Sequence, residues 1–406
     1  MRVGVVTTSY PRSADDYAGR FVADLCSAWA IAGDRIEVLA PAPAISESSG
    51  VRVIPIGLRR DRPWRLLAAG APDALWGEGS LWARGQAWAD VPSLVARLAL
   101  ATSRHGRSWD AIVSHWLIPS GILSARVGRR LPHLAVAHGS DVYRLARLPG
   151  RGLILRQLSR APSRLVLTSE ALRRPLLQAV WPRDRRTRRW IEEAVVQGMG
   201  IHLPPADEIA TFPAPGSWRG GKPKILFLGR LVPVKGVDVL LQAVSGLARS
   251  VSLSIVGDGP LRSRLEDQAA KLQLDCCFWG TQLGSRKAAL LRDADLLVMP
   301  SLILPDGRQD SAPLVLPEAL AAGVPVIASR VGGAADLLDD GVTGWLVSPG
   351  DADALRLAIA RALDDHTRRT AIAAAGRVLA EGYAWRHVAH RIRDLLVDLV
   401  DEPGRF

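Results

Sequence analysis

The chain has 406 residues, of which 48% are hydrophobic, and it carries a net charge of +12. This length exceeds one ordinary hydrophobic core and predicts two domains, while the apolar content excludes a disordered chain. No apolar run reaches the roughly 18 residues of a membrane-spanning helix, and three scattered cysteines exclude a disulfide framework.

The first residues, MRVGVVTTSYP, have neither the charged start nor the apolar run of a signal peptide. They have the pattern of a buried strand instead. Together with the sparse cysteines, this predicts a protein of the reducing cytoplasm.

The positive charge is concentrated in the first half. Residues 1–215 contain 29 Arg, no Lys and 18 acidic residues. Seven Arg lie between positions 173 and 190, with Trp181 and Trp190 close by. A GC-rich coding bias explains the use of Arg but not its uneven placement. Such a field attracts polyanions, so an anionic membrane surface, a phosphate-bearing substrate and nucleic acid are all candidate partners.

Short β-rich runs alternate with helical patterns along the whole chain. The first half has seven predicted strands: Val3–Thr7, Arg35–Ala40, Val51–Ile56, Ala111–Ser114, Leu134–Ala137, Arg164–Thr168 and Glu193–Gln197. The second half has six: Lys224–Leu228, Ser252–Val256, Cys276–Trp279, Leu296–Met299, Pro325–Ala328 and Gly344–Val347. Alternation of this kind predicts parallel sheets built from βαβ units. We therefore expect the α/β class, with two doubly wound, Rossmann-like domains.

The expected boundaries follow from composition. Residues 1–205 form the first domain, the Pro- and Gly-rich segment 206–222 is a linker, and residues 223–380 form the second domain. A final helix is expected within 381–406.

Ligands of open parallel sheets bind beyond the carboxyl ends of the strands, so the residues that follow each strand carry most of the information. Arg230 and Lys235 follow the first strand of the second half. They are either solvated charges, helix caps, or ligands of an anion at a helix N-terminus. No G-x-G-x-x-G follows the first strand and no P-loop is present, which is unfavourable to a dinucleotide oxidoreductase or a P-loop enzyme.

Two acidic residues flank a short apolar segment in DSAPLVLPE. Asp310 and Glu318 are eight positions apart, and Pro317 fits the first turn of a helix that carries Glu318. A carboxylate there either caps the helix or accepts hydrogen bonds from ribose hydroxyl groups.

Taken together, these segments resemble the family 4 retaining glycosyltransferases of GT-B fold, in which two such domains face a central cleft. In the second half the resemblance rests on GRLVPVKG (229–236), GDGP (257–260), LLRDADLLVMPS (290–301), DSAPLVLPE (310–318), ALAAGVPVIAS (319–329) and GVTGWLV (341–347). In the first half it rests on TSYPRSADDYAGRFV (8–22), HWLIPSG (115–121), AHGSDVY (137–143) and VLTSEAL (166–172). The motifs, in this order and spacing, cover almost the whole chain. The resemblance also implies that the final helix, within 381–406, crosses back to the first domain.

The resemblance implies a role for each matching position. Arg230 and Lys235 bind the donor diphosphate and stabilise the leaving group, Asp310 contacts the transferred sugar, and His138 lies beside that sugar on the acceptor side. The remaining positions contact the nucleotide or its phosphates: Gly19, Gly259, Thr281, Ala312, Pro313, Leu314, Val315 and Glu318. Asp310 and Ser311 depart from the pattern, since the family commonly has Glu and Gly there, which shortens the reach of the acid.

The implied activity is the transfer of a hexosyl group from a UDP- or GDP-sugar to a hydroxyl group of a sugar or lipid-linked acceptor, in cell-envelope polysaccharide or glycolipid synthesis. No permanently bound cofactor is implied. No Asp-x-Asp motif follows a predicted strand, so no essential metal is expected. The protein would act in the cytoplasm or peripherally on the inner face of the cell membrane.

Two alternatives share this architecture. One is a sugar-nucleotide epimerase, which needs a pair of acid and base groups that the sequence does not offer. The other is a non-catalytic protein that binds nucleotide sugar or membrane, for which loss of Arg230, Lys235 or Glu318 would be the signature; all three are present. Nucleic-acid binding rests on charge alone, without a stacking motif, and is not expected.

Overall fold

The computed structural model describes residues 1–13, 16–41, 44, 49–57, 81–127, 131–160, 162–203 and 221–402; within these, the side chains of 81–89 and 127 are not described. The predicted linker, 206–222, lies outside the described residues except for its last two positions. The chain divides into two compact units. Unit 1 comprises Met1–Gly200 and Trp385–Phe406, and unit 2 comprises Ile201–Ala384.

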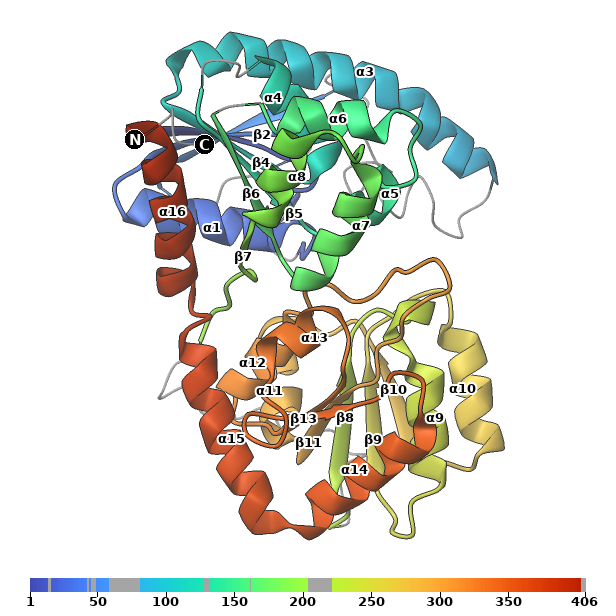
Figure 1. Cartoon of the computed structure of the whole chain (residues 1–406). Coiled ribbons are helices and arrows are strands. Elements are labelled where there is room, and N and C mark those ends of the chain that lie inside the picture. Colours follow the sequence, from blue (N-terminus) through green and yellow to red (C-terminus); the bar gives the residue numbers. More distant parts are fainter. Residues whose placement is uncertain are drawn as a thin grey trace. The chain divides into compact units, whose positions relative to one another are not determined.

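Unit 1 is built on a parallel sheet in the order β3-β2-β1-β4-β5-β6-β7 (Figure 1). Its strands are β1 (Arg2–Val6), β2 (Arg35–Pro41), β3 (Val51–Ile56), β4 (Ala111–His115), β5 (His133–Ala137), β6 (Ser163–Leu167) and β7 (Val195–Val196). Its helices are α1 (Arg20–Ile31), α3 (Leu81–His105), α4 (Ile122–Val127), α5 (Ser140–Leu145), α6 (Arg151–Leu158), α7 (Arg173–Ala179), α8 (Arg185–Glu192) and α16 (Trp385–Asp401).

Unit 2 repeats this design with the strand order β10-β9-β8-β11-β12-β13. Its strands are β8 (Lys224–Leu228), β9 (Ser252–Val256), β10 (Cys276–Gly280), β11 (Leu296–Met299), β12 (Val326–Ser329) and β13 (Trp345–Val347). Its helices are α9 (Val237–Ser245), α10 (Arg262–Lys271), α11 (Gly284–Asp293), α12 (Val315–Ala321), α13 (Gly332–Leu337), α14 (Ala352–Asp364) and α15 (His366–Glu381).

The predicted fold class is confirmed: every predicted strand is present, and both sheets are parallel. Helices cover both faces of a doubly wound sheet, so its central strands are mostly apolar. All residues of β4, β5, β9, β11 and β12 are buried, which explains why only Ser and His interrupt their apolar residues. The core of unit 2 forms around β8, β9 and β11. Unit 1 has one hydrophobic cluster at β1, β2 and β4 and another at β5 and β6.

The helix α16 returns the chain to unit 1 and runs beside α1 (Figure 1). Its buried residues recur at helical spacing: Trp385, Val388, Ala389, Ile392, Leu396 and Leu399. Trp29 of α1 donates a hydrogen bond of 2.8 Å from Nε1 to the carbonyl oxygen of Ala389. An amphipathic helix is stabilised mainly by burying such a face, so α16 is an integral part of unit 1.

A buried carboxylate also holds α16. The side chain of Asp34 is 1% exposed; it accepts hydrogen bonds from Arg393 of α16, at 2.6 and 3.1 Å, and from the amino group of Met1, at 2.8 Å. Burial acts to raise the pKa of Asp34, but the hydrogen bonds outweigh it and the pKa lies below its usual value. A depressed carboxyl pKa contributes stability at neutral pH that is lost as the pH falls through the folded-state pKa, below about pH 4.

We therefore expect Asp34→Asn to lower the free energy of unfolding of unit 1 by about 2 kcal/mol, because it leaves Arg393 without its charged partner. Urea denaturation followed by circular dichroism measures the loss. The matched control is Asp398→Asn, on α16. Asp398 forms an exposed ion pair of 3.3 Å with Arg164, which contributes about 0.5 kcal/mol or less. The difference between wild type and Asp34→Asn should shrink below about pH 4. Equal stability of the two variants at pH 7 would contradict the anchoring role.

Candidate active site

The strand order of unit 2 reverses between β8 and β11, which are neighbours in the sheet. Ligands of open α/β sheets bind beyond the carboxyl ends of strands at such a switch point. The segment after β8 carries Arg230 and Lys235, and the segment after β11 carries Asp310. The topology thus places three of the predicted residues on the two loops at the switch point.

Lys235 and Asp310 form an ion pair across this switch point. Lys235 ends a 3₁₀ turn, Pro233–Lys235, and its Nζ lies 2.6 Å from Oδ2 of Asp310, with side chains 15% and 13% exposed. The hydroxyl of Ser301 donates a 3.3 Å hydrogen bond to the same carboxylate oxygen. Partial burial of the pair strengthens the attraction relative to an exposed pair. The residue expected to bind phosphate and the residue expected to bind sugar are therefore in direct contact.

A second ion pair joins α11 to α12. Oε1 of Glu318 lies 2.7 Å from Nζ of Lys287, and both side chains are about one quarter exposed, at 23% and 26%. Glu318 lies in the first turn of α12, as predicted from Pro317. Sequence reasoning missed Lys287, since nothing in GSRKAALLRD distinguishes it from a solvated charge. Lys287 orients the Glu318 carboxylate and competes with any approaching hydroxyl donor for its oxygen atoms.

The backbone that carries Asp310 is packed tightly against the start of α13. Gly332 has a φ of +47°, and a Cβ atom on it would lie 1.9 Å from the carbonyl oxygen of Asp310. The N–H of Gly333 donates to this same oxygen at 3.1 Å, and the N–H of Gly332 donates to Oε1 of Gln309 at 2.8 Å. Only glycine allows this approach, so the loop after β12 fixes the position of Asp310.

The other predicted residues of unit 2 lie at the same edge of the sheet. Arg230 is exposed directly after β8, Gly259 follows β9 and Thr281 follows β10. The loop of Gly259 is joined to that of Arg230 by two hydrogen bonds, from the N–H of Leu231 to the carbonyl of Asp258 and from the N–H of Leu261 to the carbonyl of Leu231. The segment from Asp310 to α12 contains Ala312, Pro313 and Leu314, all partly buried, and Val315 begins the helix.

In unit 1, Gly19 lies between β1 and α1. Its φ is +69°, and a Cβ atom on it would lie 2.4 Å from the carbonyl oxygen of Ser9. Asp16 shapes this loop by accepting hydrogen bonds from Arg12 and from the N–H of Ala18. Burial acts to raise the pKa of Asp16, but these hydrogen bonds lower it overall. The loop is therefore close-packed at Gly19.

His138 follows β5 and lies against other rings at the carboxyl edge of the unit 1 sheet. Its Nε2 is 3.0 Å from Nδ1 of His115, the last residue of β4. Asp141 fixes the loop by accepting hydrogen bonds from the N–H groups of Leu117, His138 and Gly139, at 2.7 to 3.1 Å. Burial lowers the pKa of His115 to about 3, and burial together with the neighbouring His115 lowers the pKa of His138 well below its usual value. Both rings are neutral at pH 7.

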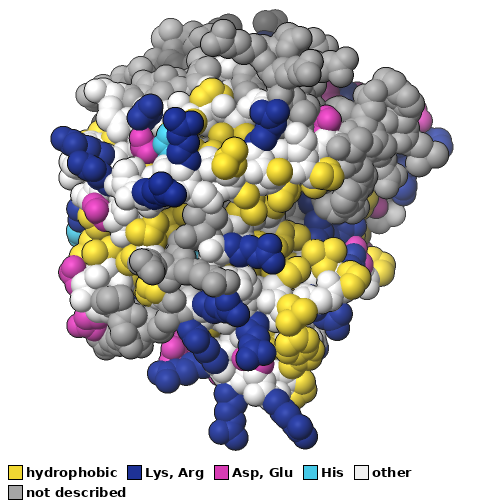
Figure 2. All heavy atoms as spheres, turned by 90° about the horizontal axis from the view of Figure 1, so that it is seen from above, with side chains coloured by type: hydrophobic (Ala, Val, Ile, Leu, Met, Phe, Trp, Pro, Cys, Tyr) yellow, Lys and Arg dark blue, Asp and Glu magenta, His cyan; other side chains and the backbone are white. Residues whose placement is uncertain are grey.

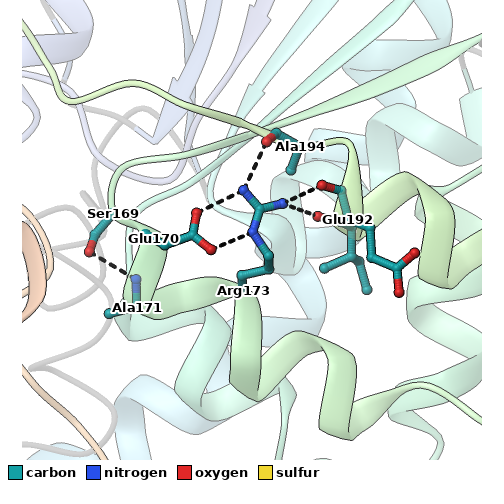
Figure 3. Close-up of polar contacts among 7 residues, drawn as sticks. Ser169, Glu170, Ala171, Arg173, Glu192 and Ala194 are labelled. Carbon is teal, nitrogen blue, oxygen red and sulfur yellow. Dashed lines mark hydrogen bonds and ion pairs between the residues drawn. The ribbon is translucent and has the colours of Figure 1, made fainter. Parts of the chain in front are cut away.

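The Arg-rich segment of unit 1 is partly internal. Figure 3 shows Arg173 of α7 in a paired hydrogen bond with Glu170, at 2.6 and 2.8 Å. Arg173 also donates to the carbonyl oxygens of Ile191, Glu192 and Ala194, at 2.5, 2.8 and 3.1 Å, which lie at the end of α8. This arginine therefore joins α7 to the carboxyl end of α8 and is not available to a partner.

Other members of the segment differ in exposure. Trp190 is 9% exposed and donates a 3.1 Å hydrogen bond to the carbonyl of Ser163, so it belongs to the core, whereas Trp181 is 46% exposed. Arg189 forms an ion pair with Glu193 at 2.7 Å, and Arg188 lies 3.8 Å from Glu192. Arg186 is exposed and donates a 3.2 Å hydrogen bond to the carbonyl oxygen of Ser159. Three further exposed arginines, Arg174, Arg183 and Arg185, are called the exposed basic surface. Within the described ranges, none of these three has an ion-pair partner.

Among the described residues, no helix is both long and apolar enough to span a bilayer. The same part of the chain has no cluster of three or more His, Cys, Asp or Glu side chains that could hold a metal ion.

Comparison with known proteins matches the sequence of this unit to a family. Residues 208–379, nearly all of unit 2, match the family described as glycosyl transferases group 1. The chain is 29% identical over 350 residues to a phosphatidyl-myo-inositol mannosyltransferase of Mycobacterium leprae, covering 82% of this chain and 87% of that one. A sucrose-phosphate synthase from Thermosynechococcus elongatus has the same fold, with a TM-score of 0.73 at 22% identity over 99% of this chain and all of that one.

The chain has the GT-B fold, and its second unit carries the glycosyltransferase match. A second structure of this fold is Anabaena HepE in complex with UDP, with a TM-score of 0.69 at 19% identity, over 98% of this chain and all of that one. The family match covers the segments that carry Arg230, Lys235, Asp310 and Glu318. The two units therefore have the folds expected of the two GT-B domains.

Proposed function

We propose that this glycosyltransferase moves a hexosyl group from a nucleotide diphosphate sugar to a hydroxyl group of a sugar or lipid-linked acceptor, with retention of anomeric configuration, as a member of family 4. The observation that carries the proposal is the Lys235–Asp310 pair at the switch point of unit 2. A cation and a carboxylate in contact there suit a ligand in which a diphosphate adjoins a polyhydroxylated ring. HepE, which has been crystallised with UDP, supports a UDP-sugar, and a GDP-sugar is the other candidate donor.

In this mechanism the chain stabilises the leaving group. Arg230 and Lys235 bind the diphosphate as the glycosidic bond breaks, and fixed positive charge at that point lowers the barrier. The backbone from Ala312 to Val315 meets the distal phosphate, and Asp310 accepts hydrogen bonds from sugar hydroxyl groups. The acceptor hydroxyl attacks the face that the diphosphate leaves and passes its proton to the departing phosphate. No protein nucleophile and no essential metal take part.

The nucleotide contacts are assigned to the other predicted residues. Glu318 accepts hydrogen bonds from the ribose, Gly259 and Thr281 lie near the base or ribose, and Gly19 lets its loop approach the diphosphate. His138 contacts the transferred sugar. The mannosyltransferase of Mycobacterium leprae supports a lipid-linked acceptor and a role in envelope glycolipid or polysaccharide synthesis.

A product assay tests the proposal. The purified chain is incubated with UDP-, GDP- and dTDP-sugars, with and without sugar and lipid-linked acceptors, and released nucleoside diphosphate and product are followed by mass spectrometry and anomeric NMR. We expect one donor to be consumed and the new glycosidic linkage to have the same anomeric configuration as the sugar in that donor. Nucleotide-sugar binding without transfer or hydrolysis would favour the non-catalytic alternative, and a new sugar nucleotide in place of a glycoside would favour an epimerase.

Glu318→Ala is expected to weaken the affinity for the free nucleoside diphosphate about tenfold or more, because a hydrogen bond to a charged group contributes about 1.5–3 kcal/mol. Isothermal titration calorimetry with UDP and GDP measures the change. The control is Asp353→Ala, because the Asp353 side chain, on α14, is 85% exposed. Unchanged affinity in Glu318→Ala would show that the ribose binds elsewhere.

We also propose that unit 1 docks peripherally on the anionic inner face of the cell membrane. The support is the excess charge of residues 1–215 and the exposed basic surface of Arg174, Arg183 and Arg185, beside the half-exposed Trp181. Figure 2 shows one face of the chain on which Lys and Arg side chains are spread among hydrophobic ones, a composition suited to a lipid interface.

Liposome co-sedimentation tests the docking. Binding is expected with anionic vesicles, not with neutral ones, and it should fall as salt rises. Each basic residue near the surface contributes about 1 kcal/mol, so replacing Arg174, Arg183 and Arg185 with Gln should weaken binding about a hundredfold. The matched control replaces three exposed arginines of unit 2: Arg249, Arg264 and Arg361. A wild-type chain that stays in the supernatant at low salt would favour a soluble acceptor.

A further inference from the structure

Four rings meet at the carboxyl edge of the unit 1 sheet, beyond β4 and β5. The ring of His138 lies 5.2 Å from His115, at an interplanar angle of 21°, and 4.8 and 4.9 Å from Trp116 and Phe21. Trp116 adopts a φ of +68°, a conformation that is rare for an aromatic residue and costs strain. The chain thus keeps a strained backbone at the position where Trp116 contacts His138.

The contact between the two histidines is directional. Both rings are neutral at pH 7, so each carries one N–H and one lone pair. Nδ1 of His115 and Nε2 of His138 are 3.0 Å apart, and one of them must donate. The tautomer of one ring therefore determines the tautomer of the other.

The burial of His115 decides which ring donates. His115 is 0% exposed, and its other nitrogen, Nε2, is buried with no hydrogen-bond partner among the described residues. If His138 donated, Nε2 of His115 would carry a buried, unpaired N–H. If His115 donates, the same atom carries only a lone pair. Buried unpaired N–H groups are rarer than unpaired acceptors, so the proton belongs on Nδ1 of His115.

We propose that His115 is a positioning residue that holds His138 in its Nδ1–H tautomer. His138, which is partly exposed, then presents an N–H donor to a ligand, while its Nε2 lone pair is occupied by His115. A ring held in this way hydrogen-bonds to a hydroxyl or ring oxygen and does not remove a proton through Nε2. The identification of that oxygen with the transferred sugar rests on the proposed function; the tautomer itself does not.

NMR of protein labelled with ¹⁵N-histidine tests the tautomer without any substrate. The His138 signals are assigned by their loss in His138→Gln. We expect wild-type His138 to be protonated on Nδ1 at pH 7. His115→Asn keeps a donor near the position of Nδ1 and should preserve this state, whereas His115→Phe keeps the ring but removes the donor and should shift His138 towards Nε2–H. A wild-type His138 protonated on Nε2, or an unchanged tautomer in His115→Phe, overturns the proposal.

Activity provides the second readout. With the donor found by the product assay, His115→Phe should lower kcat/KM about tenfold to a hundredfold, by analogy with the loss of residues that orient metal-ligating histidines. His115→Asn should restore most of it, and both variants should keep wild-type affinity for UDP or GDP in calorimetry. Equal activity losses in the two variants would show that His115 contributes packing and does not orient His138. A wild-type chain that transfers no sugar would refute the proposed function but leave the tautomer result intact.

Discussion

Lys235→Ala and Arg230→Ala should each lower turnover by about two to three orders of magnitude, the scale of removing one preorganised group that stabilises developing charge. In the absence of ligand, Lys235 is held by Asp310 at 2.6 Å. An arriving diphosphate carries more negative charge than this carboxylate and would draw Lys235 towards itself. Asp310 would then be released to accept hydrogen bonds from the sugar, so the pair couples the recognition of the two halves of the donor.

Steady-state kinetics on the identified donor measures the effect. Lys224→Met is the control, because Lys224 begins β8, the strand that precedes Lys235, and forms a partly buried ion pair with Asp293 at 2.8 Å. Lys224 lies at the amino end of β8, whereas Lys235 follows the carboxyl end, so the loss of Lys224 should leave turnover near the wild-type value. Near-wild-type turnover in Lys235→Ala or Arg230→Ala would refute the diphosphate role. An equal loss in Lys224→Met would point to general damage in unit 2.

Gly332→Ala is expected to lower turnover about a hundredfold. A methyl group 1.9 Å from the carbonyl oxygen of Asp310 cannot be accommodated, so the backbone of Asp310 must move by an ångström or more. Displacement of a positioning group by about 1 Å costs on the order of a hundredfold in rate. The expected defect therefore comes from misplacing Asp310, although Gly332 itself has no side chain to contact a substrate.

Gly307→Ala separates the clash from backbone strain. Gly307 also has a positive φ, +80°, but a Cβ atom on it would have no neighbour within 4 Å. This control should cost about 1–2 kcal/mol of stability, from the left-handed conformation alone, and little activity. Kinetics and thermal denaturation of both variants distinguish the cases. If the two variants lose activity equally, the contact between Gly332 and Asp310 does not position the acid.

The strands were predictable from sequence because burial on both faces favours a short, mostly apolar run. β8, β9 and β11 have the predicted bounds. β7 is shorter than predicted, Val195–Val196 in place of Glu193–Gln197, because Glu193 is the C-cap of α8 and its N–H donates to the carbonyl of Arg189 at 2.8 Å. A helix end and a strand start compete for the same residues there, and local pattern does not decide between them.

For the candidate site, sequence predicts which loops come together, because that follows from the sheet topology, but not the side-chain contacts between them. Residues that follow parallel strands gather at one edge of a sheet, which placed Lys235 and Asp310 together although they are 75 positions apart. Their ion pair, and that of Lys287 with Glu318, depend on side-chain reach between separate loops and helices, which no periodicity encodes. Trp190 shows a second limit of sequence reasoning. Its Arg neighbours suggest a surface position, but it lies on the buried face of the amphipathic helix α8.

Because unit 2 is a continuous segment inserted between the two parts of unit 1, the order of synthesis differs from the order of completion. As the chain leaves the ribosome, Met1–Gly200 emerges first but lacks α16, and the faces of α1 and Asp34 that α16 covers stay open. Unit 2 emerges whole before α16 does and is free to fold at once. The domain that starts first therefore finishes last, and a nascent chain truncated before Trp385 presents an uncovered apolar helix to chaperones and proteases.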